Sequence, residues 1–278
     1  MAVLTIASGS TPPFQLMAVS LAIGGMLGIV ICLFRRQGFS ALRQPALVWL
    51  LGVTGLFGYH FAYFTALRNA PPVEAGLIAY LWPLFIVLLS TLLPEERLRW
   101  FHLAGGALGL AGAALLVSGG NGFNFQQAHV FGYTMAFLCA LIWSAYSVLS
   151  RRFDNVPSEI VTGFCLVSAL LAWVAHLALE ETLWPVSPVE WLAVVGLGLG
   201  PIGLAFYVWD YGVKHGDIQV LGAVSYLAPL LSTLALIYAG YATFSLSIVI
   251  ACLLIMGGAI LASKELLTQI FQAHSSKP

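Results

Sequence analysis

The stretch Gly76-Leu-Ile-Ala-Tyr80-Leu-Trp-Pro83 is repeated in outline as Gly222-Ala-Val-Ser-Tyr226-Leu-Ala-Pro229. Both copies fit the pattern Gly-x-x-x-Tyr-Leu-x-Pro, lie 146 residues apart, and fall inside long apolar stretches. Tyr and Pro are the informative members, because Gly and Leu are abundant in this chain. The spacing predicts that the chain consists of two copies of one structural unit.

The composition differs from that of a water-soluble globular domain. Of 278 residues, 60% are hydrophobic and 8% are charged, whereas a soluble domain carries about 25% charged residues. The chain is therefore predicted to be embedded in a lipid bilayer. Its formal net charge is zero, so no nucleic-acid partner is expected. The four cysteines stand singly in apolar segments without metal-ligand spacing, so neither a metal nor another cofactor is expected.

Nine apolar stretches are long enough to cross the membrane, which requires about 20 residues per helix. They predict an all-α, polytopic membrane helix bundle. The stretches are 14–34, 46–67, 73–93, 101–118, 130–150, 160–179, 190–210, 218–239 and 244–263.

The basic residues assign sides to the connections. When the loops alternate, ten of the eleven Lys and Arg residues fall on one side, and only Arg68 falls on the other. The ten are Arg35, Arg36, Arg43, Arg97, Arg99, Arg151, Arg152, Lys214, Lys264 and Lys277. Cytoplasmic loops carry the excess of basic residues, so this side and the C-terminus are predicted to be cytoplasmic.

The 146-residue offset pairs four spans of the first half with four of the second. The span 130–150 would pair with positions before residue 1, so the first half as printed lacks its opening helix, and residues 1–7 are predicted to be its last turns. The complete design is two repeats of five helices each. Because five is odd, the second repeat enters the bilayer from the opposite side, which makes an inverted repeat.

This organisation predicts four segments. They are a first repeat at 1–118, a connecting loop at 119–129, a second repeat at 130–264 and a cytoplasmic tail at 265–278. Two full halves in one chain remove the need for a dimer, so a monomer is expected.

Polar and amphipathic side chains within the spans usually face the bundle interior or a cavity. The candidates for lining a central cavity are Tyr59, His60, Tyr80, Trp82, Trp143, Tyr146, Ser225 and Tyr226. Pro83 and Pro229 are predicted to kink their helices and to free carbonyls near Ala79 and Ser225 for a ligand or a hydroxyl. A kink needed only for packing is the alternative, and His60 is equally compatible with a structural, hydrogen-bonded role.

Other features have structural interpretations. Trp184, Trp191 and Trp209 are predicted to be membrane-interface anchors, and Asp210 and Lys214 to form a helix-end ion pair. Glu74, in the first turn of its helix, complements the helix dipole or attracts a substrate amine. Three Gly-x-x-x-Gly pairs are predicted to let helices approach closely; they begin at Gly24, Gly105 and Gly196.

Enzyme motifs are missing from the sequence, which has no HExxH, no GxSxG, no paired intramembrane carboxylates and no phosphate-binding loop. The predicted interior combines aromatic rings, hydroxyls and backbone carbonyls with few formal charges. Such an interior suits a small neutral, zwitterionic or amphipathic solute, since rings stack on Tyr and Trp and an ammonium binds a ring face.

Two segments carry a family resemblance. Glu74-Ala-Gly-Leu-Ile-Ala-Tyr80-Leu-Trp-Pro83, and Trp209-Asp-Tyr-Gly-Val-Lys-His215 followed by Ala223-Val-Ser-Tyr226-Leu-Ala-Pro229, resemble the drug/metabolite transporter (DMT) superfamily. Within it they are most similar to the YddG-type aromatic amino acid exporters of the EamA group. The similarity extends from about residue 10 to 263.

The resemblance implies ten helices in two inverted halves, a bacterial inner-membrane location, and export of aromatic and other neutral amino acids through a central cavity by alternating access. The first alternative is the same fold carrying another metabolite, such as a nucleotide sugar, or an amphipathic drug. Sugar phosphates would require several inward-facing basic residues, and this chain has almost none at depth. A non-transporting membrane protein is the second alternative.

Overall fold

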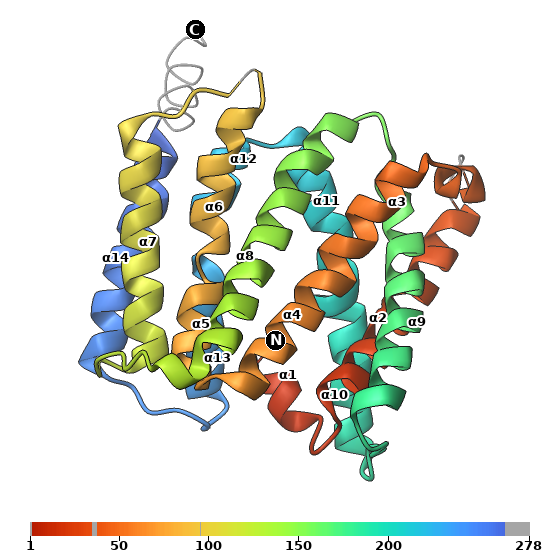
Figure 1. Ribbon diagram of the computed structural model, residues 1–278, viewed down its shortest axis with the longest axis horizontal. Coiled ribbons are helices and arrows are strands. Elements are labelled where there is room, and N and C mark those ends of the chain that lie inside the picture. The colour runs from red at the N-terminus through yellow and green to blue at the C-terminus, as the bar shows by residue number, and fades with distance from the viewer. Residues whose placement is uncertain (1, 35–37, 95, 265–278) are drawn as a thin grey trace, which may run out of the picture.

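The computed structural model describes residues 2–34, 38–94 and 96–264, and in these ranges the chain forms helices and connections without strands. Figure 1 shows the helices side by side in one bundle. Helices α7 (Trp100–Ser118) and α14 (Leu246–Ala262) lie at one edge, and α2 (Pro13–Phe34) and α9 (Val161–Leu179) lie at the other. Among the described residues, eight helices are long and apolar enough to span a membrane, and a ninth apolar helix, α14, is shorter. The predictions about Arg35, Arg36, Lys277 and the tail 265–278 lie outside the described residues.

The observed spans confirm the nine predicted stretches to within a few residues. They are Pro13–Phe34, Ala46–Asn69, Pro72–Leu92, Trp100–Ser118, Gln127–Phe153, Ser158–Leu179, Pro188–His215, Ile218–Tyr238 and Leu246–Ala262. The largest difference is the span predicted at 190–210, which continues to His215. The last turn of that helix is stabilised by Lys214, which donates a hydrogen bond to Asp210 one turn earlier.

Four spans contain breaks at positions related by the 146-residue offset. The helix pairs α3 (Ala46–Val53) and α4 (Tyr59–Asn69), and α10 (Pro188–Leu199) and α11 (Ala205–His215), are each joined by a π-helical turn, at Thr54–Gly58 and Gly200–Leu204. The pairs α5 (Pro72–Ala79) and α6 (Trp82–Leu89), and α12 (Ile218–Val224) and α13 (Leu227–Tyr238), are each interrupted at the motif tyrosine.

Both motif helices are interrupted just before their prolines, at Tyr80 and Tyr226, and the freed carbonyls differ from the prediction. The Ser225 carbonyl accepts a hydrogen bond from the Ala228 backbone N–H at 3.0 Å. At the first break, hydroxyls reach two other carbonyls: Tyr226 Oη donates to the Tyr80 carbonyl at 3.1 Å, and Ser144 Oγ lies 2.8 Å from the Trp82 carbonyl oxygen. The carbonyls bonded by side chains therefore follow Ala79 by one and three residues.

The two motif copies run in opposite directions, as an odd number of helices per half predicts. Figure 1 shows α5 leading up to α6 while α12 leads down to α13. Tyr80 contacts Tyr226, and further along the same pair Gln219 Nε2 donates to Ser90 Oγ at 3.0 Å. The two motif copies are therefore antiparallel.

The first short helix, α1 (Ala2–Ala7), packs against α10 and α13. The offset relates these two helices to α3 and α6, and both of those pack against α8 (Val130–Ser150). Residues 2–7 therefore lie where the repeat pattern predicts the last turns of a helix equivalent to α8.

Two of the three glycine pairs bring helices into close contact. A Cβ at Gly24 would lie 2.7 Å from Gly203 Cα, and one at Gly105 would lie 2.5 Å from the Gly258 carbonyl oxygen. The prediction is wrong for Gly200, where a Cβ would meet nothing within 4 Å. The π-helical turn that begins at Gly200 rotates the helix, so Gly198 and Gly203 make the close approaches instead.

Candidate functional site

Three tryptophans from three helices meet near the middle of the bundle. Trp82 of α6 lies edge-on to Trp143 of α8 and Trp209 of α11, at centroid distances of 6.3 and 5.6 Å, and Trp143 stacks on Trp209 at 5.8 Å. Tyr59 of α4 and Phe206 of α11 contact Trp143 at 5.3 and 5.8 Å. We call these five residues the aromatic cluster. It draws on four helices and on both halves of the chain.

Hydrogen bonds hold the cluster in place. Trp209 Nε1 donates to Ser147 Oγ at 3.0 Å. Ser144 Oγ lies 2.8 Å from the carbonyl oxygen of Trp82, so α8 is bonded to the α5–α6 break. Indole and hydroxyl donors that are buried usually find such partners. Here the bond to Ser147 restricts how the Trp209 ring turns, and the Ser144 bond holds the backbone that carries Trp82.

The prediction that Trp209 is an interface anchor is wrong. The helix that carries it extends six residues further, to His215, about 9 Å along the axis at 1.5 Å per residue. Trp209 therefore lies at the depth of the aromatic cluster. The offset could have found it, because the residue 146 positions earlier is Tyr63, which the sequence already places within a span. Trp184 and Trp191 are exposed at the opposite end and stack on each other at 6.0 Å.

His60 lies beside the aromatic cluster and is buried. Its Nδ1 is 2.7 Å from the Leu56 carbonyl oxygen, within the π-helical turn. Because a carbonyl only accepts, Nδ1 carries the proton. The ring also lies edge-on to Phe206 at 6.0 Å. His60 thus stabilises the turn that places Tyr59 next to Trp143.

The motif tyrosines occupy different environments. Tyr80 is half-buried, whereas Tyr226 is fully buried and packs against Gly109, where a Cβ would lie 2.3 Å from its ring. In this structure Tyr226 is therefore a packing residue at the crossing of the two breaks, which corrects its expected position on a cavity wall. Ser225 is half-buried, and its hydroxyl donates to the Leu221 carbonyl at 2.6 Å.

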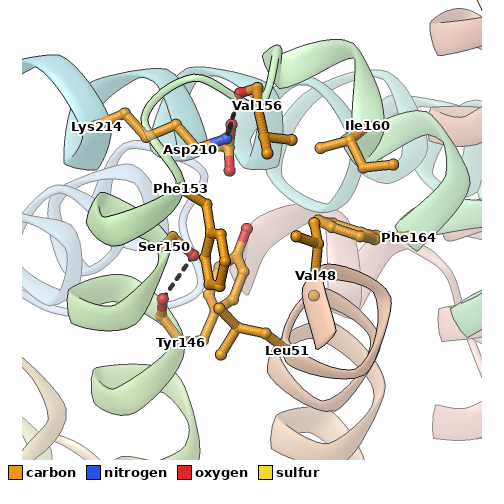
Figure 2. A pocket seen from close by; sticks show the side chains of 11 residues that line it. Val48, Leu51, Tyr146, Ser150, Phe153, Val156, Ile160, Phe164, Asp210 and Lys214 are labelled. Atoms are coloured by element: carbon orange, nitrogen blue, oxygen red, sulfur yellow. Dashed lines mark hydrogen bonds and ion pairs between the residues drawn. The ribbon is translucent and has the colours of Figure 1, made fainter. Parts of the chain in front are cut away.

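Tyr146 points away from the aromatic cluster. Its ring contacts Trp143 at 5.3 Å on one side and lines a separate small cavity with Asp210 and Lys214 on the other (Figure 2). The predicted Asp210–Lys214 ion pair is confirmed, with Nζ 2.7 Å from Oδ2. Of the eight predicted site residues, the structure brings four together in or beside the aromatic cluster: Tyr59, His60, Trp82 and Trp143. The other four lie at the helix breaks (Tyr80, Ser225 and Tyr226) or at this small cavity (Tyr146).

Comparison with known proteins explains this architecture. The EamA-like transporter family matches residues 1–118 and 130–264. The chain belongs to the EamA-like transporter family. It is 54% identical to the aromatic amino acid exporter YddG of Ancylobacter novellus over 264 residues, which cover 95% of this chain and 92% of that protein. A solved crystal structure with 54% sequence identity superposes with a TM-score of 0.90 and covers 94% of this chain and 91% of that one. The aromatic amino acid exporter YddG of Escherichia coli is 26% identical over 81% of this chain and 80% of its own length.

This EamA-family chain also has a charged cluster that the sequence analysis missed. The Glu180 carboxylate accepts hydrogen bonds from the backbone N–H groups of Phe14 and Gln15, at the start of α2, and from Arg68 and His176. A carboxylate at a helix N-terminus is favoured by the helix dipole. We call these groups the Glu180 cluster; it connects the ends of α2, α4 and α9.

Glu74 is held at the same end of this EamA-family bundle. It is buried in the first turn of α5, and its Oε1 accepts a hydrogen bond from the Asn124 backbone N–H at 2.9 Å. Its place in the first turn suits the helix dipole, but its hydrogen bond goes to the loop between the two halves and not to the first turn of α5.

Proposed function

We propose that this chain is a secondary transporter that exports amino acids, aromatic and other neutral ones, by alternating access of a central site. The observation that carries the proposal is the aromatic cluster, which is assembled from four helices of both halves. A site shared by two halves changes shape when the halves rock against each other. Its exposure can therefore alternate between the two sides of the membrane.

The chemistry of the cluster fits an amino acid with an apolar or aromatic side chain. Indole faces accept stacked rings and apolar groups, and they attract an ammonium group through the negative ring face. Trp82 and Trp209 are only partly buried, so part of each ring is available to a solute. The relatives named as aromatic amino acid exporters support this substrate class.

The broken helices provide the flexible joints of this mechanism. Helices α5–α6 and α12–α13 are interrupted at Tyr80 and Tyr226, where they cross. Discontinuous helices that meet near the midplane are a feature of inverted-repeat transporters. The outer segments can then tilt while the crossing point stays in place.

The orientation and assembly belong to the same proposal. We place the chain in a bacterial inner membrane with the C-terminus in the cytoplasm, supported by the distribution of Lys and Arg. The proposed organisation is a repeat at 1–118, a loop at 119–129, an inverted repeat at 130–264 and a tail at 265–278. The protein is proposed to act as a monomer without cofactors and not as an enzyme.

Counterflow in liposomes tests the proposal. Vesicles that contain the purified protein and unlabelled phenylalanine should accumulate labelled phenylalanine from outside, with threonine as the second substrate. Empty vesicles and vesicles preloaded with glucose are the controls. Accumulation of either amino acid no greater than in empty vesicles would contradict the exporter function, and accumulation of another metabolite instead would favour the alternative substrate class.

A further inference from the structure

A small cavity lies next to the aromatic cluster, separated from it by Tyr146, at the end of the bundle that carries Lys214. Its volume is about 10 Å³, and it lies among α3, the end of α8, the connection to α9, and α11. In Figure 2 the side chains of Tyr146, Ser150, Asp210 and Lys214 lie on the left with the Phe153 ring among them, and Val48, Ile160 and Phe164 lie on the right. The polar groups of the cavity therefore lie on one side, and the opposite wall is apolar.

The polar wall contains a buried pair of opposite charges. The side chains of Lys214 and Asp210 are 3% and 2% exposed, and Lys214 Nζ also donates to the Val156 carbonyl at 2.9 Å. A buried ion pair is weak evidence for stability, because both ions lose their hydration. Charges within membrane spans are more often part of a binding site or transport path.

Tyr146 adds an unsatisfied hydroxyl to the same wall. Tyr146 is 2% exposed, and its Oη makes no hydrogen bond of good geometry among the described residues, although Asp210 and Ser150 lie near enough to interact with it. Buried hydroxyls usually have a partner, so a lone one calls for an explanation. It lines the cavity together with Asp210 and Lys214.

The cavity is also connected to the aromatic cluster. The ring of Tyr146 contacts that of Trp143 at 5.3 Å, so a single tyrosine separates the two sites. Under the orientation proposed above, this cavity lies between the cluster and the cytoplasm. A solute that moves outward from the cytoplasm would reach the cavity first.

We propose that this cavity is the collapsed form of an inner binding site for zwitterionic amino acids. Asp210 binds the α-ammonium group, Lys214 and the Tyr146 hydroxyl bind the α-carboxylate, and the apolar wall, which includes Val48 and Phe164, receives the side chain. This inference deepens the proposed function and rests on it. In this inference, the Asp210–Lys214 pair recognises the charged groups of the substrate before the substrate reaches the aromatic cluster.

Charge balance favours a zwitterion over other ligands. When a zwitterion inserts between Asp210 and Lys214, each of the four charges keeps an opposite partner. A simple amine would leave Lys214 unpaired, and a simple carboxylic acid would leave Asp210 unpaired. An uncompensated buried charge is strongly unfavourable, so the pair selects against both.

The site must open before it binds. A volume of about 10 Å³ is no larger than the space for one water molecule. The hydrogen bond from Lys214 to Val156 holds the connection between α8 and α9 against α11. Breaking this bond lets the connection move away and exposes the ion pair to the cytoplasmic side.

Sided membrane vesicles test the proposal. Initial uptake of labelled phenylalanine into inside-out vesicles reports the cytoplasmic face, and uptake into right-side-out vesicles reports the outer face. Asp210→Asn should raise the KM at the cytoplasmic face at least 10-fold and leave the KM at the outer face within twofold. The matched control is Arg68→Gln, which removes the equivalent cation of the other half and should leave the cytoplasmic-face KM within twofold.

Competitors separate zwitterion recognition from a purely structural ion pair. In wild-type inside-out vesicles, unlabelled phenylalanine should compete at least 10-fold better than phenethylamine or 3-phenylpropionate, and in Asp210→Asn its advantage over phenethylamine should fall below threefold. A changed maximum rate with unchanged KM and unchanged competitor ranking would overturn the proposal, as would a KM effect at the outer face alone. If wild-type vesicles do not transport phenylalanine at all, the proposed function fails and this inference fails with it.

If Asp210→Asn does not reach the membrane, Tyr146→Phe is the second variant that tests the site. The substitution leaves the ion pair intact and removes only the hydroxyl. It should raise the cytoplasmic-face KM about threefold or more. Unchanged KM values at both faces would overturn the site.

Discussion

The broken helices α5–α6 and α12–α13 carry the same motif but have different roles. The first places Trp82 in the aromatic cluster, while the equivalent position in the second is Ala228, an exposed residue. Tyr80 is half-buried, whereas Tyr226 is fully buried. The duplicated frame thus places a residue of the aromatic cluster on one copy and a packed crossing on the other, and the first is the proposed binding surface.

The contact between the two tyrosines is one-sided. The Tyr226 hydroxyl donates to the Tyr80 carbonyl, so residues at equivalent positions meet each other. Among the described residues, no reciprocal bond runs from the Tyr80 hydroxyl to the Tyr226 carbonyl, so the two copies use their tyrosines differently. An approximate two-fold arrangement is therefore compatible with chemistry that differs between the halves.

Alanine substitutions at the two tyrosines give the largest expected difference. Tyr226→Ala should lower the free energy of unfolding by about 3–5 kcal/mol, since truncating a fully buried aromatic ring leaves a cavity. Tyr80→Ala should cost less stability but reduce phenylalanine counterflow. Thermal unfolding in detergent, with counterflow on the same preparations, measures both; equal losses of stability would contradict the different roles of the two copies.

A glycine next to Tyr226 tests the packed crossing directly. Gly109→Ala should destabilise the fold by about 1–3 kcal/mol, because the new Cβ would lie 2.3 Å from the Tyr226 ring. Gly257→Ala on α14 is the control, since a Cβ there meets nothing within 4 Å. If both variants unfold at the wild-type temperature, the crossing is not tightly packed.

Trp82 tests the binding surface of the other copy, with the smallest expected effect. Trp82→Phe keeps an aromatic ring but weakens its contacts with Trp143 and Trp209, and it should weaken phenylalanine binding by about 0.5–1.5 kcal/mol, or roughly 2- to 12-fold in Kd. Trp184→Phe, outside the aromatic cluster, should bind as the wild type does. Isothermal titration of the purified variants measures the affinities, and identical values for both would remove Trp82 from the site.

The sequence analysis predicted the depth of residues in the membrane more accurately than the face of the helix on which they lie. The apolar stretches correctly placed Trp82 and Trp143 within spans, and both lie in the aromatic cluster. It placed Tyr226 correctly in depth but on the wrong surface, and the interface interpretation of Trp209 failed because the helix continues to His215. The Glu180 cluster joins residues more than 100 positions apart, and no local pattern marks such a contact.

The sequence by itself determined the number of spans, their paired order and the two helix breaks, because these depend on apolar length and on proline, which act locally. Only the tertiary structure decided that Trp209 joins Trp82, that Tyr226 is packed against Gly109, and that Asp210, Lys214 and Tyr146 share a cavity. The physical reason is that lipid is as apolar as the protein interior. Hydrophobicity therefore marks a membrane helix but not the face with which it meets its neighbours.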